Sequence, residues 1–307
     1  MKFTKKDPII IIGAGKISWS LVPALLYAGY KINSIISSTK KDADKLASAF
    51  ALKNYPAELN AIKIKKGIFV LAVPDARIKT VADKLAHMDF NFPDSLFIHL
   101  SGSQDISLLN SLEVKGSHTA SFHIMHTFPL KKTRQIKNSF SAVETNSESA
   151  YEYLFKLARD MKLNPFRLNS TDKVIYHLAG VFASNFINAV LYQSKKLAGM
   201  LNLNDYSFND VFDPLFLSTI QNIKKTGPVN ALSGPVERGD SETIKKHIKA
   251  LQGYPEILHS YLSLSLILIE TAKERSGSLN PGQLEIKQIL EKELSGLVIP
   301  AKAGIHS

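Results

Sequence analysis

Short apolar runs alternate with helical patterns through the first half of the chain. Runs rich in branched and aromatic residues, typical of buried strands, lie at 8–12, 31–36, 67–73 and 95–100. The stretches between these runs predict helices at 16–29, 42–52 and 76–88. Because strands alternate with helices in units of about thirty residues, the pattern predicts a parallel sheet with helices on both faces.

The pattern changes near residue 173, where long helical stretches without strands begin. The stretch 173–201 is apolar on much of its surface and predicts one long helix. A helix at 207–225, a Gly/Pro-rich loop at 227–240 and two or three more helices follow. We therefore predict an α/β chain with a doubly wound parallel sheet at 1–168, an all-α domain at 169–295 and a loose tail at 296–307.

Two glycines stand between the first predicted strand and the first helix. Gly13 permits a tight turn, and Gly15 lets the backbone approach a pyrophosphate at the N-terminus of the helix. Lys16 and Ile17 follow and are expected beside the same group, while Ser18 takes the third position of the glycine fingerprint. The motif predicts dinucleotide binding. A glycine-rich turn in an α/β domain without a ligand is the alternative.

The ends of the later strands refine this prediction. Domains that prefer NAD usually carry an acidic residue where the second strand ends, but this chain has hydroxyls and a lysine there. Such groups would bind a 2′-phosphate rather than repel it, so we predict NADP(H) as the cofactor; a simple polar turn is the alternative. The third strand end is expected beside the cofactor and the fourth near the nicotinamide and the substrate. The residues concerned are Ser37, Ser38, Thr39 and Lys40, then Val73, Pro74 and Asp75, then Ser101 and Gly102.

One face of the predicted long helix is polar. Lys173, His177, Ser184 and Asn188 share a stripe at 100° per residue, and Asn185 lies about a third of a turn away. Burial near a cofactor would lower the pKa of a lysine and make it a proton donor to a carbonyl group. The alternative is that the first turns of the helix are simply exposed.

Two further segments carry candidate polar residues. Arg238 could bind a substrate carboxylate, and Asp240 could orient Arg238 or cap the next helix. His123 and His126 lack a third ligand at suitable spacing, so no metal site is predicted.

Composition narrows the possible partners. Cysteine is absent, which excludes disulfides and a thiol nucleophile. The net charge of +11 comes from dispersed lysine pairs, so we expect a small anionic partner rather than nucleic acid. No continuous apolar run reaches the length of a membrane span and no signal peptide is visible, so we expect a cytoplasmic protein.

The motifs taken together resemble a known family. "GAGKIS", "VLAVPD", "HLSGS", "SFHIMHTFP", "DKVIYHLAGVFASN" and "GPVERGD", in this order, resemble Rossmann-like proteins whose C-terminal half is domain of unknown function 2520. These are similar in plan to pyrroline-5-carboxylate reductase and 6-phosphogluconate dehydrogenase, and one branch is known as an alternative ketopantoate reductase. The chain departs from the family where Ile124 replaces the usual proline after His123, and where Lys65 and Lys66 replace an acidic residue.

The resemblance implies an N-terminal NADP domain, a helical domain that forms a homodimer, and a cleft lined by residues from both. The residues expected to face that cleft are Lys173, His177, Ser184 and Asn185, with Ser101, Gly102 and His123 opposite.

We therefore expect an NADPH-dependent reductase of a small 2-oxo acid, with ketopantoate as the first candidate. Lys173 would stabilise or protonate the developing alkoxide, and His177 and Asn185 would position it. The alternatives are an imine reductase of the pyrroline-5-carboxylate type and a non-catalytic NADP(H)-binding sensor or scaffold.

Overall fold

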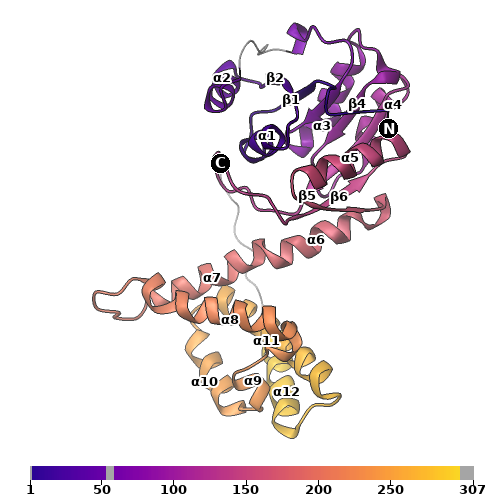
Figure 1. The fold of residues 1–307 in the computed structure, drawn as a ribbon. Helices are drawn as coiled ribbons and strands as arrows, with labels where there is room; N and C mark the ends of the chain where they lie inside the picture. Colours follow the sequence, from indigo (N-terminus) through magenta and orange to yellow (C-terminus); the bar gives the residue numbers. More distant parts are fainter. Residues whose placement is uncertain (1, 53–58, 298–307) are drawn as a thin grey trace. The chain divides into compact units, whose positions relative to one another are not determined.

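The computed structural model describes residues 2–52 and 59–297, which form two compact units. The units are Met1–Asn188 and Ala189–Ser307 (Figure 1). Their boundary lies twenty residues beyond the boundary predicted at 168, because the first helix of the supposed helical domain, α6 (Lys173–Ala183), belongs to the unit that holds the sheet. The predicted tail at 296–307 lies outside the described residues beyond Leu297.

The first unit contains a seven-stranded sheet in the order β2-β1-β3-β4-β5-β6-β7. Strands β1 to β5 are parallel to one another, as the sequence predicts. The sheet is not wholly parallel, however, because β6 pairs antiparallel with β5 and β7 runs parallel to β6. The strands are Ile9–Ile12 (β1), Ile32–Ile36 (β2), Ile68–Leu71 (β3), Leu96–His99 (β4), His118–Ile124 (β5), Phe140–Glu144 (β6) and Asn164–Arg167 (β7).

The apolar strands have both faces covered, which explains their unbroken runs of apolar residues. Alternate isoleucines of β1 enter different clusters: Ile9 and Ile11 pack with α1, α2 and α5, whereas Ile10 and Ile12 pack with α3 and α4. This alternation is the period-2 geometry of a strand. The helices of this unit are Ser18–Tyr27 (α1), Lys40–Ala49 (α2), Asp75–Ala86 (α3), Asn110–Glu113 (α4), Glu148–Asp160 (α5) and α6, with 3-10 turns at Leu59–Ala61, Phe92–Asp94, Ile106–Leu109 and Ser170–Asp172.

The second unit is helical and has its own apolar core, which includes Ile244, Leu262 and Leu290. The loop predicted at 227–240 is partly helical, because α8 continues past a kink at Gly227 and a short helix follows. The remaining helices are Asn185–Ala198 (α7, which crosses the unit boundary), Phe208–Asn230 (α8), Pro235–Arg238 (α9), Ser241–Leu251 (α10), Pro255–Ser276 (α11) and Pro281–Gly296 (α12).

The long helix predicted from residue 173 is interrupted. Ser184 leaves helical geometry, at φ −136° and ψ −67°, and separates α6 from α7. By length and composition alone, the whole stretch Ser170–Ala198 is nevertheless long and apolar enough to cross a membrane. Lys173, in its first turns, is buried in the first unit.

Candidate functional site

The turn after β1 can be built only with glycine. Gly13 has a φ of +121°, and a Cβ at this position would overlap the carbonyl oxygen of Ala72, which follows β3. The Ser18 hydroxyl donates to the Gly13 carbonyl at 2.6 Å and ties the turn to the first residue of α1. At Gly15, by contrast, the nearest atom to a Cβ would be 3.8 Å away. The backbone before α1 is therefore closely packed on one side and open on the other, as a helix N-terminus that receives an anion requires.

A pocket of about 910 Å³ opens at this turn, along the carboxyl ends of β1, β2 and β3. Ligands of open α/β sheets bind at this position. Six of the residues predicted to bind the cofactor line the pocket: Gly13, Gly15, Ser37, Ser38, Val73 and Pro74.

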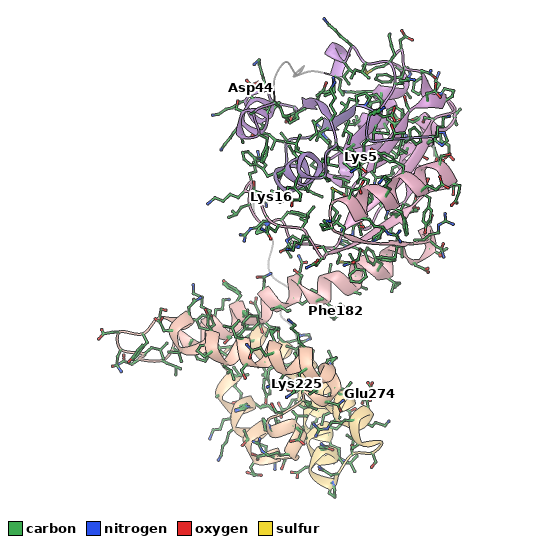
Figure 2. All side chains as sticks on the ribbon, in the orientation of Figure 1. Lys5, Lys16, Asp44, Phe182, Lys225 and Glu274 are labelled. Atoms are coloured by element: carbon green, nitrogen blue, oxygen red, sulfur yellow. The ribbon has the colours of Figure 1, made fainter. Side chains whose placement is uncertain are left out.

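Five other residues predicted for the cofactor site do not line the pocket. Lys16 is exposed at the surface (Figure 2), and Ile17 precedes α1. Thr39 caps α2 by accepting from the Asp42 backbone N–H, and Lys40 is ion-paired with Asp44, 2.8 Å away on the same helix. The fifth residue, Asp75, is turned toward the loop after β4.

The rim of the pocket carries cations that the sequence did not single out. Arg77 and Lys84 come from α3, and Lys131 comes from the segment between β5 and β6. Lys131 Nζ lies 2.8 Å from an oxygen of Asp42, the acidic residue of this lining. The hydrogen bonds from Lys131 and Thr39 lower the pKa of Asp42, so its carboxylate is kept ionised and paired.

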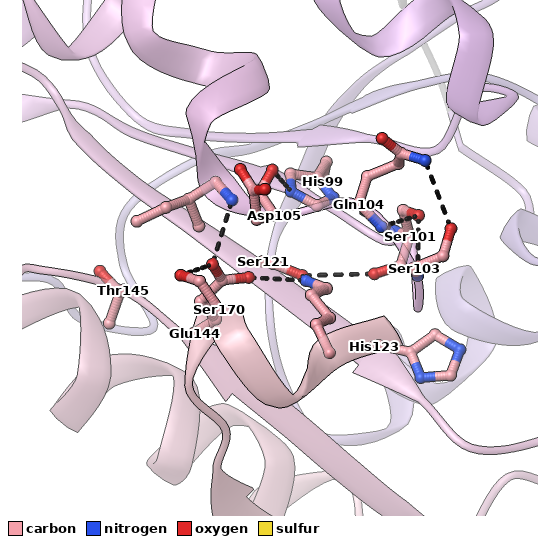
Figure 3. A network of polar contacts seen from close by, with 12 residues as sticks. His99, Ser101, Ser103, Gln104, Asp105, Ser121, His123, Glu144, Thr145 and Ser170 are labelled. Atoms are coloured by element: carbon pink, nitrogen blue, oxygen red, sulfur yellow. Dashed lines mark hydrogen bonds and ion pairs between the residues drawn. The ribbon is translucent and has the colours of Figure 1, made fainter. Parts of the chain in front are cut away.

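The loop after β4 is held by the hydroxyl of Ser101 (Figure 3). That hydroxyl donates to Asp75 at 2.7 Å and accepts from the backbone N–H groups of Ser103 and Gln104 at 3.1–3.3 Å. Because these bonds use its donor and two acceptor sites, Ser101 shapes the loop, and its predicted contact with substrate is not supported.

His99 fixes the same loop through hydrogen bonds to its backbone. The ring is fully buried, its Nδ1 accepts from the Ser101 N–H at 3.3 Å, and its Nε2 lies 3.1 Å from the Asp105 carbonyl. Burial, aided by the charge of Lys173, lowers the pKa of His99 to about 3. His99 is therefore neutral, with the proton on Nε2.

Lys173 lies in the interior of the first unit, not in an open cleft. Its side chain is 2% exposed, and Nζ is 2.7 Å from Glu144 Oε2 and also contacts the hydroxyl of Ser121. The other carboxylate oxygen of Glu144 accepts from the Ser170 hydroxyl at 2.6 Å and from the Ile106 N–H at 3.2 Å (Figure 3). Burial lowers the pKa of Lys173 while Glu144 opposes that shift. Burial thus lowers the pKa of Lys173 as the sequence predicts, and the alternative of an exposed lysine is wrong. The sequence did not indicate that a carboxylate 29 residues earlier pairs with this lysine, and its contact with a substrate stays a prediction.

Lys173 nevertheless places other residues. Positions three and four residues later share its helix face, so the pair with Glu144 turns Tyr176 and His177 toward the ends of β4 and β5. The Tyr176 hydroxyl lies 3.0 Å from His123 Nδ1, and the His123 and His177 rings are 6.3 Å apart. A Cβ on Gly102 would lie 2.7 Å from His123 Nε2 and 2.8 Å from His177 Cδ2. Gly102 therefore provides the space in which these two imidazoles meet.

Four other predicted residues lie at helix ends. Ser184 is at the break between α6 and α7, and Asn185, which follows it, is exposed. Arg238 is exposed in α9 of the second unit, so its contact with a substrate stays a prediction. Asp240 caps α10 by accepting from the Thr243 N–H at 3.0 Å, which confirms the capping alternative.

Two family matches cover most of the chain. Residues 5–124 match the Rossmann-like domain family, and residues 139–267 match the family described as domain of unknown function (DUF2520). The chain joins a Rossmann-like domain to a DUF2520 domain. The DUF2520 match begins at β6, so Glu144 and Lys173 both belong to it. No curated protein matches the chain.

Several solved structures resemble this chain. Protein BF3122 from Bacteroides fragilis, named as a candidate NADP oxidoreductase, has 24% identity and a TM-score of 0.73 over 86% of this chain and 98% of its own. Protein TM1727 from Thermotoga maritima has 26% identity and a TM-score of 0.68 over 87% and 98%. A pyrroline-5-carboxylate reductase from Coxiella burnetii has 16% identity and a TM-score of 0.55 over 92% and 98%. These similarities establish a shared fold.

The first unit contains both the pocket at the glycine turn and a cluster that includes two neutral donors, His123 and Tyr176. Burial, reinforced by His177, lowers the pKa of His123 to about 4, so its ring is uncharged near neutral pH. Burial also raises the pKa of Tyr176 to about 12. Sequence reasoning missed Tyr176 and Glu144. The helical spacing from Lys173 could have indicated Tyr176, whereas Glu144 carries no local signal.

Proposed function

We propose that the protein is an NADPH-dependent reductase of a small carbonyl compound. The observation that carries the proposal is the pocket at the glycine turn, where Gly13 must be glycine and Gly15 leaves the helix N-terminus open. Its volume is in the range of ligand and cofactor sites. Membership of a Rossmann-like family and the fold shared with a candidate NADP oxidoreductase support the same cofactor.

The rim of the pocket favours the phosphorylated cofactor. Ser37 and Ser38 offer hydroxyls at the end of β2, and Arg77 and Lys131 offer positive charge. Asp42 does not cancel this preference, because its carboxylate is already paired with Lys131. These groups replace Thr39 and Lys40 in the predicted phosphate site.

Residues of the chain itself would stabilise and protonate the substrate oxygen. Bound NADPH would supply the hydride to the substrate carbon. His123, neutral and next to Gly102, would stabilise the negative charge that develops on the oxygen, and exposed His177 would connect that oxygen to solvent protons. Lys173 holds α6 in place and does not donate the proton.

The substrate that we place first is a 2-oxo acid, with ketopantoate as the leading candidate and Arg238 as the group proposed to bind its carboxylate. A cyclic imine of the pyrroline-5-carboxylate type is the second candidate. The buried position of Lys173 favours it, because reduction of an imine needs less proton donation than reduction of a ketone. The shared fold with a pyrroline-5-carboxylate reductase is consistent with this alternative.

An NADPH oxidation assay tests the proposal. The purified protein is mixed with NADPH and ketopantoate, pyrroline-5-carboxylate or a panel of 2-oxo acids, and loss of reduced nicotinamide absorbance is followed. Rapid oxidation with ketopantoate alone supports the first substrate, and oxidation with the imine alone supports the second. NADPH binding without any turnover would instead support the non-catalytic sensor or scaffold.

We further propose a homodimer in the cytoplasm, formed through the helices. The exposed apolar side chains along α6 and the start of α7, such as Phe182 (Figure 2), form a surface suited to a second copy. The others are Val174, Ile175, Leu178 and Phe186. Light scattering of the purified protein should give twice the mass of one chain, and a monomer at micromolar concentration would contradict the dimer.

A further inference from the structure

We infer that the Tyr176 hydroxyl is a positioning group that holds the His123 ring in the tautomer with Nε2 as its N–H donor, aimed at the space beside Gly102. The inference rests on the proposed function, since it names the group that prepares His123 for a substrate oxygen. It concerns one partly buried hydrogen bond and can be tested without a known substrate.

The hydrogen bond fixes the proton position because of what each partner can do. Tyr176 O lies 3.0 Å from His123 Nδ1, and the two rings meet edge to face at 86°. Among the described residues, no other hydrogen bond is formed by the Tyr176 hydroxyl. A phenol is a better donor than acceptor, so its proton points to Nδ1, and neutral histidine must then carry its own proton on Nε2.

The other nitrogen of the ring faces Gly102. Nε2 has no hydrogen-bond partner in the described part of the chain, and it lies 2.7 Å from the position that a Cβ on residue 102 would occupy. A side chain at residue 102 would therefore press on this nitrogen, whereas glycine leaves it uncovered on that side. His177 borders the same space through its Cδ2.

Tyr176 is itself held rigidly. Its ring packs edge to face on Phe166 of β7, with centroids 5.7 Å apart. Lys173, three residues earlier on α6, is anchored to Glu144. The hydroxyl therefore approaches His123 from a fixed direction, so the donor is already oriented in the folded protein before any substrate binds.

The charged and titratable groups around His123 keep its ring neutral. Lys173 and His177 of α6 disfavour the imidazolium, and Asp75 of α3 favours it, but burial dominates. A neutral ring donates a hydrogen bond without releasing a full charge into the pocket. The Tyr176 hydroxyl adds to this effect, because a donor to Nδ1 stabilises the unprotonated nitrogen.

The test is the tautomer of His123, read by nuclear magnetic resonance. The protein is labelled with 15N-histidine, long-range proton–nitrogen correlations are recorded across a pH titration, and the His123→Asn spectrum identifies the signals. In the unmodified protein we expect His123 to be protonated on Nε2 and to remain neutral throughout the stable pH range. Protonation on Nδ1 would overturn the inference without any Tyr176 variant.

Removal of one oxygen supplies the second measurement. In Tyr176→Phe we expect the preference for the Nε2–H tautomer to fall about 2- to 10-fold, as loss of one hydrogen bond implies, and His123 to titrate at higher pH. Tyr206→Phe removes the hydroxyl of an exposed tyrosine in the second unit and should change neither value. The signals of buried His99 report whether each variant is folded.

The same samples separate this inference from the proposed function. An unchanged His123 tautomer in folded Tyr176→Phe, with NADPH bound normally, refutes the positioning role alone. Failure of the unmodified protein to bind NADPH refutes the proposed function and leaves the tautomer result standing.

Discussion

The buried pair between Lys173 and Glu144 permits the sharpest test of the site. Replacing Lys173 with methionine keeps most of the side-chain volume and leaves the Glu144 carboxylate in the interior without its cation. Removing one partner of a buried pair costs about 3–5 kcal/mol. Glu144 retains hydrogen bonds from Ser170 and the Ile106 N–H, so we expect a loss near the lower limit, about 3 kcal/mol.

Urea unfolding followed by tryptophan fluorescence measures this loss. Trp19 is the single tryptophan of the chain and lies in α1, so its signal reports on the unit that contains the pair. A matched control is Lys156→Met, whose partner Asp160 is on the same helix near the surface. An exposed pair of this kind should cost at most about 1 kcal/mol.

A double variant separates the pair from the packing of the lysine chain. In Lys173→Met combined with Glu144→Gln, no buried charge remains, so we expect much of the lost stability to return. The reasoning fails if the free energy of unfolding of Lys173→Met is within about 0.5 kcal/mol of that of the parent protein while its rate of NADPH oxidation falls more than about 100-fold. That combination would mean that the lysine acts on the substrate and not through the fold.

Three further predictions follow from other parts of the first unit. Lys131→Ala should weaken NADPH binding about 10-fold relative to NADH binding, because it removes a cation from the pocket rim. The control Lys132→Ala changes a lysine that does not line the pocket and should leave the binding of both cofactors unchanged. Equal losses for both cofactors in a fluorescence titration of Lys131→Ala would contradict a 2′-phosphate contact. Gly102→Ala should abolish turnover while NADPH binding stays within about 2-fold, because the added methyl group displaces the imidazoles of His123 and His177 and Gly102 does not line the cofactor pocket; unchanged turnover would exclude the two histidines from the reaction. His99 has a pKa of about 3 in the folded protein against 6.5 for the free group, so the unfolded chain binds the proton first as the pH is lowered. The free energy of unfolding should therefore decrease as the pH drops below 6.5, by at most about 1.4 kcal/mol per pH unit from this group. In urea unfolding, His99→Gln should show a smaller dependence of this free energy on pH.

The sequence predicts the fold best where local pattern and burial agree. Strands β1, β3 and β4 are buried on both faces and almost wholly apolar, so their composition alone reveals them. The strands at the far edge lack this signal: β7 reads Asn-Pro-Phe-Arg, and proline is tolerated there because the strand lies at the edge. Their antiparallel junction with β5 depends on a connection that no local pattern specifies.

The same reasoning explains the outcome at the site. Gly13 and Gly15 were predictable because backbone geometry at a strand-to-helix turn has a residue requirement of its own. Lys173 was assigned to the cleft because periodicity shows which residues share a helix face. It does not show what that face meets, and Glu144, on a strand 29 residues earlier, changes a free ammonium into a buried partner.

The buried pair lies within the DUF2520 match and positions a contact with the Rossmann-like match. Glu144 ends β6, Lys173 begins α6, and one turn later the helix delivers Tyr176 to His123, which lies in β5. A change in the rotation of α6 would move Tyr176 and His177 together, whereas the glycine turn before α1 would stay in place. Cofactor binding and the orientation of the proton donor are therefore set by separate contacts. This separation is why stability, cofactor affinity and the His123 tautomer can be measured as independent consequences of changes at Lys173, Lys131 and Tyr176.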